Sequence, residues 1–227
     1  MSSQSADVII VGGGVMGCAV AYYLLKADPR LNITIIERDS TYAKASTTLS
    51  DGNTRIQFNL KENIQMSLYG LEVLARFSED MATDEHVPDV AFRQQGNLFI
   101  IDEASEAAAK EGLALQKQLG CEVEWLEPDR VRQIYPIYSG VECVGATFGP
   151  KDGTMSPLDV LLAYRRKAIS LGARVLEASV GELLKAGRRM RGVRLTSGET
   201  LTAETLSNMA GACSPKLAQP LGVTLPI

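Results

Sequence analysis

The sequence predicts an α/β protein with a parallel central sheet, into which a β-rich α+β segment is inserted. Residues 7–11 and 32–37 are short apolar runs, as expected of parallel strands that are buried on both faces. The residues between them have helical spacing, and the strand, helix and strand fit within about 30 residues, the size of one βαβ unit. From about residue 87 this pattern gives way to several short runs typical of strands.

In the first part of the chain, a helix is expected at 15–27, where Asp28-Pro29 ends it. Residues 38–59 are polar and rich in Ser and Thr, which predicts a long loop, and such loops are often functional. A second helix is expected at 61–81. In the inserted segment we expect strand residues at 92–101 with a turn at Gly96-Asn97, a helix at 103–119, a strand at 123–126, a helical turn at 128–134 and a strand at 141–148.

The last third of the chain returns to the first pattern. We expect a helix at 157–171, a strand at 173–176, a meander of strands at 180–184, 191–196 and 199–202, a last buried strand at 205–209 and a short helix at Ser214. The hairpin turn of the meander is Ser197-Gly198. The predicted domains are therefore residues 1–86 and 151–227, as two segments of one central-sheet domain, and residues 87–150 as the insert.

A glycine motif lies where the first strand meets the first helix. Gly12 is expected to make the tight turn, Gly14 to let backbone approach a pyrophosphate, and Gly17 to let the helix pack closely on the strand. The first helical residues, Val15 and Met16, add unpaired N–H groups and the positive end of the helix dipole. The motif in this context predicts a phosphate-binding turn.

Glu37 lies 20 residues after Gly17, at the end of the second strand. A carboxylate there can accept both ribose hydroxyls of an adenosine, and it would repel a 2′-phosphate, which disfavours NADP. The alternative is a glycine turn that only packs helix on strand, with Glu37 solvated at the strand end. The spacing favours a site for the ADP half of a dinucleotide.

FAD and NAD share that ADP half, so the residues that follow must distinguish them. An NAD dehydrogenase usually continues into further βαβ units, whereas this chain continues into the Ser/Thr loop. A flavin needs donors along its ribityl chain and second phosphate, and Ser46, Thr47, Thr48 and the backbone around Gly52 are candidates. A plain solvated loop is the alternative.

Composition excludes several other classes. The net charge of −4 argues against nucleic acid as a partner, because phosphate neutralisation needs clustered Lys and Arg. The four cysteines form no CxxC pair, and a single His86 leaves little for a metal site. We see no signal peptide and no apolar run near the roughly 20 residues that span a bilayer. A cytoplasmic location is expected.

Several stretches carry a resemblance to a known family. They are DVIIVGGGVMGCAVAYYL (7–24), IIERD (35–39), ASTTLSDGNTR (45–55), GATFGPKDGTMSPLDVLLAYRRKAISLGARV (145–175) and RGVRLTSGETLTAETLSNMAGACS (191–214). In this order they resemble the D-amino-acid oxidase (DAO) superfamily of FAD-dependent oxidoreductases, in its glycine and sarcosine oxidase-like branch. The resemblance implies a Rossmann-like FAD-binding domain with an inserted substrate domain. It also implies that this chain corresponds to the N-terminal portion of such an enzyme.

The resemblance assigns roles to particular residues. It implies that Glu37 binds ribose, Arg38 packs near adenine, Ser46 and Thr47 contact pyrophosphate and ribityl, Val180 contacts adenine through its backbone, and Gly211 allows close approach of the chain. Met209 stands where the family has Ala. No His lies in the Ser/Thr loop, so the covalent flavin linkage of some relatives is not expected.

The implied reaction is oxidation of a C–N bond in a small amine or amino acid, with hydride passing to the flavin. Arg55 is the candidate catalytic residue, because a guanidinium can pair with a substrate carboxylate or stabilise flavin charge. A structural salt bridge or a solvated side chain is an equal alternative. An NAD-dependent dehydrogenase and a non-catalytic dinucleotide-binding module also remain open. Exposed strand edges lead us to expect an oligomer or a partner chain.

Overall fold

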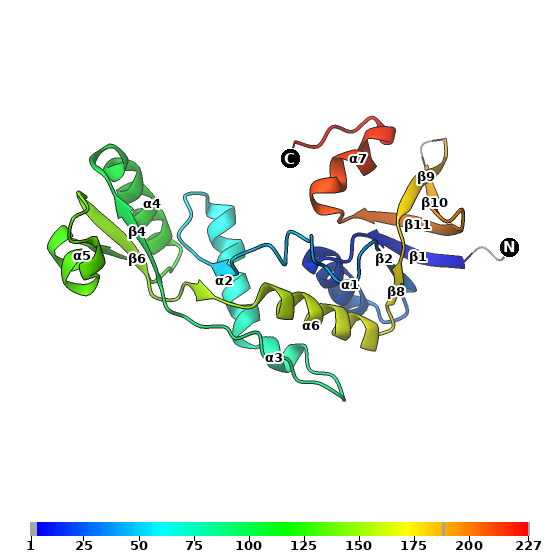
Figure 1. The fold of residues 1–227 in the computed structure, drawn as a ribbon, viewed down its shortest axis with the longest axis horizontal. Coiled ribbons are helices and arrows are strands. Elements are labelled where there is room, and N and C mark those ends of the chain that lie inside the picture. The colour runs from blue at the N-terminus through cyan, green and yellow to red at the C-terminus, as the bar shows by residue number, and fades with distance from the viewer. Residues whose placement is uncertain (1–3, 188, 227) are drawn as a thin grey trace. The chain divides into compact units, whose positions relative to one another are not determined.

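The computed structural model describes residues 4–187 and 189–226, which fall into two units. The first unit comprises Met1–Ser50, Glu79–Pro88 and Pro157–Ile227, and the second comprises Asp51–Ser78 and Asp89–Ser156 (Figure 1). The chain therefore leaves the first unit and returns to it twice, so the second unit is made of two inserted segments. No helix among the described residues is long and apolar enough to cross a membrane.

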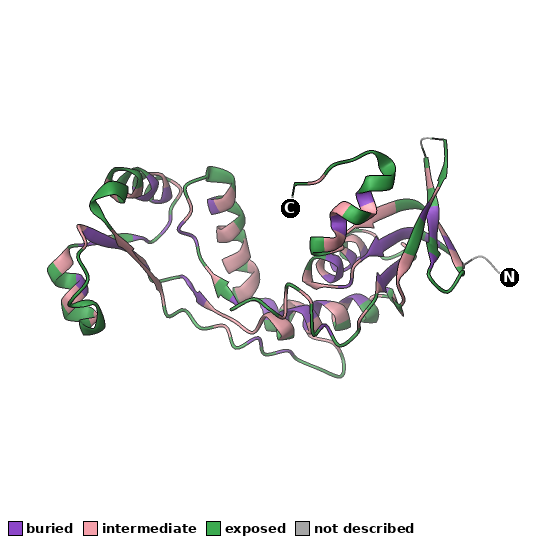
Figure 2. Cartoon of the chain, turned by 45° about the horizontal axis from the view of Figure 1, so that its top comes forward, coloured by how far each residue is buried: buried purple, intermediate pink, exposed green. Residues whose placement is uncertain are grey.

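A six-stranded sheet forms the centre of the first unit. Its order is β8-β2-β1-β11-β10-β9, and it is mixed, because the first four strands are parallel and the last two run antiparallel. The bounds are β1 (Gln4–Val11), β2 (Ile33–Glu37), β8 (Arg174–Glu177), β9 (Val180–Ala186), β10 (Arg189–Leu195) and β11 (Thr200–Asn208). Figure 2 shows that β1 and β2 carry mostly buried residues. The α/β class and the parallel βαβ unit are confirmed.

Strand β11 corrects one expectation. A meander strand at 199–202 and a separate buried strand at 205–209 were predicted, but one continuous strand spans both. Its residues Leu201 to Asn208 pair in parallel with Gln4 to Val11 of β1, while its first residues also pair antiparallel with β10. Because the two ladders lie on opposite edges of the same strand, no break is needed, and Leu206 is only half-buried.

Helices cover this sheet. Helix α1 (Val15–Ala27) packs against α6 (Pro157–Ser170), and the rings of Tyr22 and Tyr164 have centroids 5.7 Å apart. The short helix α7 (Ser214–Ala218) follows β11. A core cluster fills the interior of the unit and includes the buried residues Ile9, Ile36, Val193 and Leu201.

The second unit is built around the antiparallel sheet β4-β6-β5 and a two-stranded pair, β3 with β7. Its elements are β3 (Asn53–Thr54), α2 (Lys61–Ala75), β4 (Asn97–Ile101), α4 (Glu106–Gln118), β5 (Glu124–Leu126), α5 (Pro128–Ile134), β6 (Gly145–Gly149) and β7 (Gly153–Thr154). The strand expected at 141–148 begins later, at Gly145, and of the strand residues expected at 92–101 only those from Asn97 onward form a strand, after the turn expected at Gly96-Asn97. Gly96, with φ +77°, turns the chain immediately before β4.

The helix expected at 61–81 is interrupted at Arg76, and a short helix α3 (Phe77–Asp80) follows. The expected domain boundary at residues 86 and 87 also differs from the observed division, which assigns α2 to the second unit. The reason is packing. Ile64 of α2 is fully buried in a cluster with Ile56, Leu113 and Val123, all from the second unit.

Candidate functional site

The glycine turn lies between β1 and α1. At two of its three motif glycines, no side chain would fit. Gly12 has φ +105°, and a Cβ there would lie 2.2 Å from the Met209 carbonyl oxygen. A Cβ on Gly17 would lie 1.9 Å from the Gly12 oxygen. Gly14 differs, because the nearest atom to its imaginary Cβ is Thr47 Oγ1 at 3.8 Å. The turn is therefore tight against the protein but open at Gly14.

The Glu37 carboxylate lies beside this turn. Its Oε2 accepts a hydrogen bond from the Gly13 N–H at 2.7 Å, and its Oε1 accepts from the Asp39 N–H at 3.0 Å. Gly13 must lack a side chain here, because a Cβ would lie 2.9 Å from the Cβ of Glu37. Gly13 was not among the predicted site residues, although the run of three glycines pointed to it.

The Ser/Thr loop, which follows Glu37, reaches the same turn. The Val15 N–H donates to Thr47 Oγ1 at 3.4 Å, a long contact. Ser46 Oγ lies 4.0 Å from the position of a Cβ on Gly211, which has φ +54°. Parts of the chain far apart in sequence thus meet at the carboxyl ends of β1 and β11, the edge where open α/β sheets bind ligands.

Arg38 and Cys213 form a second link at this edge. The Arg38 guanidinium donates to the Cys213 sulfur at 3.6 Å, and both residues are accessible to solvent. Sequence reasoning did not include Cys213, since a single cysteine after a strand carries no recognisable signal. The contact joins the segment after β2 to the segment after β11.

Buried polar groups support the turn from within the first unit. The Cys18 thiol donates to the Gly13 carbonyl oxygen at 3.1 Å, and burial raises the pKa of that thiol to about 12. Tyr42 is 3% exposed and has φ +56°, and burial raises the pKa of its phenol to about 12. The Arg165 guanidinium lies near both groups and opposes these shifts. Sequence analysis identified none of the three.

Three further predicted site residues have the following places in the structure. Val180 begins β9, where it pairs with Leu195 of β10. Gly52, which is buried and has φ +73°, and Arg55 belong to the second unit. The structure therefore brings the turn, Glu37, the Ser/Thr loop and Gly211 together. The binding roles of these residues stay predictions, as do those of Val180, Gly52 and Arg55.

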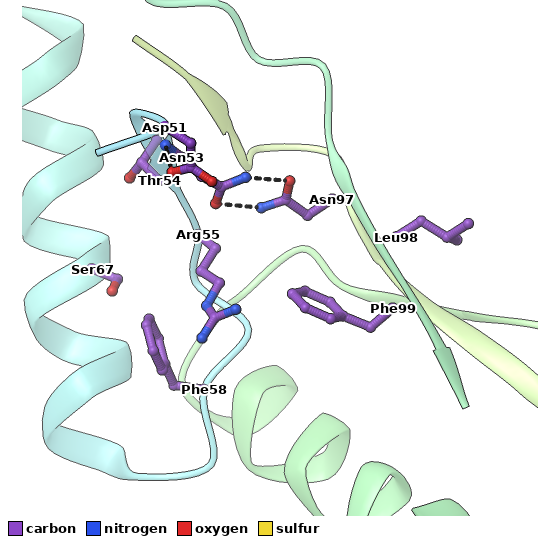
Figure 3. A pocket seen from close by; sticks show the side chains of 9 residues that line it. All are labelled: Asp51, Asn53, Thr54, Arg55, Phe58, Ser67, Asn97, Leu98 and Phe99. Atoms are coloured by element: carbon purple, nitrogen blue, oxygen red, sulfur yellow. Dashed lines mark hydrogen bonds between the residues drawn. The ribbon is translucent and has the colours of Figure 1, made fainter. Parts of the chain in front are cut away.

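Arg55 lines a pocket of about 600 Å³ in the second unit. Its guanidinium carbon lies 4.7 Å from the ring centroid of Phe58 and 5.3 Å from that of Phe99, and Figure 3 shows the guanidinium between the two rings. Among the described residues, no carboxylate forms an ion pair with it. The amides of Asn53 and Asn97 pair reciprocally, at 2.9 and 3.0 Å, on the same wall.

The chemistry of the turn is that of an anion site next to a diol acceptor. Backbone N–H groups at the start of α1 are suited to phosphate, and the Glu37 carboxylate is suited to hydroxyl donors. These donors and acceptors fit the ADP half of FAD. No cluster of three or more potential metal ligands occurs among the described residues.

Comparisons with known proteins agree on one family. A profile described as "FAD dependent oxidoreductase", that of the DAO family, matches residues 7–227. FAD-dependent oxidoreductase domain-containing protein 1 of Xenopus laevis is 32% identical over 243 residues, which are 97% of this chain and 49% of that protein. Sarcosine oxidase subunit beta of Arthrobacter sp is 28% identical over 235 residues, 99% of this chain and 55% of that protein. The chain spans about half the length of these relatives.

Solved structures show the same fold. L-proline dehydrogenase from P. horikoshii has a TM-score of 0.85 at 23% identity, and the match covers 100% of this chain and 58% of that one. Glycine oxidase from Geobacillus kaustophilus has a TM-score of 0.83 at 23% identity, with 98% and 60% covered. With its glycine turn, its facing carboxylate and its inserted unit, the chain belongs to the DAO family of FAD-dependent oxidoreductases.

Proposed function

We propose that the first unit binds FAD non-covalently. The observation that carries this proposal is the Glu37 carboxylate held beside the glycine turn, with space left at Gly14. The residues of this unit proposed to contact the cofactor are Gly12, Gly14, Val15, Met16, Gly17, Glu37, Arg38, Ser46, Thr47, Val180 and Gly211. Gly52, which the structure assigns to the second unit, is proposed only from the family resemblance. The turn would hold the diphosphate through N–H groups, and Glu37 would accept the ribose hydroxyls.

We infer further that the reaction is oxidation of a C–N bond in a small amine or amino acid. Bound FAD supplies the hydride acceptor, which leaves binding and orientation to the protein. The relatives named sarcosine oxidase subunit beta and sarcosine dehydrogenase, together with the glycine oxidase and L-proline dehydrogenase folds, support this class. Arg55 would meet the substrate carboxylate or stabilise flavin charge, and the rings of Phe58 and Phe99 would hold its guanidinium in place.

Two measurements test the proposal. Purified protein is titrated with FAD and, separately, with NAD, while the flavin absorption band and ligand binding are followed. FAD binding without NAD binding is expected, and the reverse would favour an NAD-dependent dehydrogenase. The FAD-loaded protein is then assayed with sarcosine, glycine and D-amino acids. Flavin bleaching by one of these substrates is expected, and tight FAD binding without bleaching by any amine would favour a non-catalytic module. A cytoplasmic location and association with another chain stay predictions.

A further inference from the structure

A buried carboxylate is hydrogen-bonded to the segment that carries Arg55. Asp152 has no exposed surface and lies between β6 and β7. Its Oδ1 accepts a hydrogen bond from the Ile56 N–H at 2.8 Å, and its Oδ2 accepts from Gln57 Nε2 at 2.9 Å. Both oxygens are therefore bound to the two residues that immediately follow Arg55.

The hydrogen bonds continue from this carboxylate to both walls of the pocket. The Ile56 carbonyl accepts from the Phe58 N–H at 2.9 Å, so fixing Ile56 also fixes the backbone of one ring beside Arg55. The Gln57 amide donates in addition to the Asn97 carbonyl at 3.0 Å, two residues before Phe99. Arg55, Phe58 and Phe99 are thus all tied, through backbone, to one side chain.

A carboxylate at this position carries a desolvation cost, which its hydrogen bonds offset in part. A buried charge costs free energy unless it is paired or fully hydrogen-bonded, and a neutral side chain would avoid that cost. Burial raises the pKa of Asp152, although its hydrogen bonds and the charge of Arg55 oppose the shift. A buried carboxylate that is costly to desolvate and that orders the segment after Arg55 suggests that the geometry of this segment is important for function.

We propose that Asp152 is a positioning residue for Arg55. By holding the backbone at Ile56 and the amide of Gln57, it sets the guanidinium between the Phe58 and Phe99 rings and toward the pocket. The functional meaning of this role rests on the proposed function of Arg55, but the geometric role does not depend on it.

The direct test is the NMR signal of the Arg55 Nε–Hε group in the full chain. Because two aromatic rings flank the guanidinium, the wild-type signal is expected away from those of solvated arginines, and Arg55→Lys identifies it by its loss. Asp152→Ala should move the signal toward that of arginines without aromatic neighbours. Asp152→Asn, which keeps an acceptor for Ile56, should move it less. Asp129→Asn removes a fully exposed carboxylate of the same unit and should leave it unchanged.

The second readout is the affinity for benzoate, used as a simple carboxylate probe for Arg55 and measured by titration calorimetry. Asp152→Ala and Arg55→Lys should each weaken benzoate binding by about tenfold, the effect of one charge-assisted hydrogen bond, while FAD affinity stays at the wild-type value. If Asp152→Ala does not fold, Gln57→Met removes one of the two donors and is compared in its place. A smaller signal shift in the same direction is then expected.

The two proposals fail in different ways. An unshifted Arg55 signal in folded Asp152→Ala, or in Gln57→Met where that variant replaces it, overturns the positioning role. Wild-type protein that does not bind benzoate contradicts the carboxylate role of Arg55, whereas the signal shift still decides whether Asp152 positions the side chain. Equal losses of benzoate and FAD binding in folded Asp152→Ala would indicate general disruption and would also overturn the inference.

Discussion

The Gly13 N–H donates a 2.7 Å hydrogen bond to the Glu37 carboxylate, although 24 positions separate the two residues in the chain. The bond places the acid at the glycine turn. The turn and the acid are thus one preorganised unit, and the free energy of ordering them is spent in folding rather than in binding. Each half of the unit can be changed separately.

Glu37→Gln should weaken FAD binding by about tenfold to a hundredfold, because hydrogen bonds to a charged acceptor contribute about 1.5–3 kcal/mol. Flavin fluorescence quenching measures the dissociation constant. Glu177→Gln is the matched control, since Glu177 pairs with Glu37 in the neighbouring strand β8 and is exposed. Equal affinity of Glu37→Gln and wild type would remove Glu37 from the site.

Substitutions at two glycines of the turn should affect different properties, one the stability of the fold and the other the binding of FAD. Gly17→Ala places a Cβ 1.9 Å from the Gly12 oxygen, a backbone atom that no rotamer change can move. We expect it to lower the free energy of unfolding by about 3 kcal/mol in urea denaturation, an overpacking effect.

Gly14→Ala is the contrasting change, because its Cβ would meet only Thr47 Oγ1 at 3.8 Å. Its Tm should stay near the wild-type value, whereas its FAD affinity should fall by about tenfold, because the new methyl group points into the space assigned to the diphosphate. A stable Gly14→Ala protein that binds FAD normally would show that the diphosphate lies elsewhere.

Local pattern was sufficient for much of the fold. Helix α1 was expected at 15–27 and occupies Val15–Ala27, because an apolar face, a glycine start and Asp28-Pro29 all agree. The local sequence pattern did not predict those features that depend on contacts between residues far apart in the chain. Strand β11 is one element because β1 pairs along its whole length, and α2 joins the second unit because Ile64 finds its partners there.

The candidate site divides in the same way. The turn and Glu37 follow from spacing, since a βαβ unit brings the end of its second strand beside the first turn. Cys213, Tyr42 and Asp152 could not be found from the sequence, because each acquires its contacts only through folding. Asp152 lies in a stretch that is typical of a turn, and nothing local distinguishes it from a solvated aspartate.

Cysteine reactivity offers a test of the nucleotide edge. The thiols of Cys18 and Cys121 are buried, and burial raises the pKa of each, to about 12 for Cys18, so both should resist iodoacetamide in the folded protein. Cys143 and Cys213 are partly accessible and should react. Mass spectrometry of the alkylated peptides gives the rates.

FAD should slow the alkylation of Cys213, because its sulfur contacts the Arg38 guanidinium, which we assign to the adenine side of the cofactor. Cys143 lies in the second unit and serves as the internal control, with the same rate in both samples. If FAD binds but Cys213 reacts at an unchanged rate, Arg38 and Cys213 do not border the nucleotide.

The pKa of Asp152 predicts how stability changes with pH. Burial raises it above the ordinary value, so the folded protein keeps this proton to a higher pH than the unfolded chain does. In that interval the folded state binds more protons, so the free energy of unfolding falls as pH rises from about 4 through the folded pKa. Asp152→Asn lacks this titration, so its free energy of unfolding, relative to wild type, should rise with pH.

Trp125 is the single tryptophan and lies in the second unit together with Asp152, so its fluorescence reports the unfolding of that unit in urea. Asp129→Asn, which loses a fully exposed carboxylate, should follow the wild-type slope. If the free energy of unfolding of Asp152→Asn, relative to wild type, instead falls with pH, the hydrogen bonds from Ile56 and Gln57 outweigh the effect of burial on the pKa of Asp152. The folded carboxylate would then favour ionisation, and Asp152 would stabilise the segment mainly as an anion.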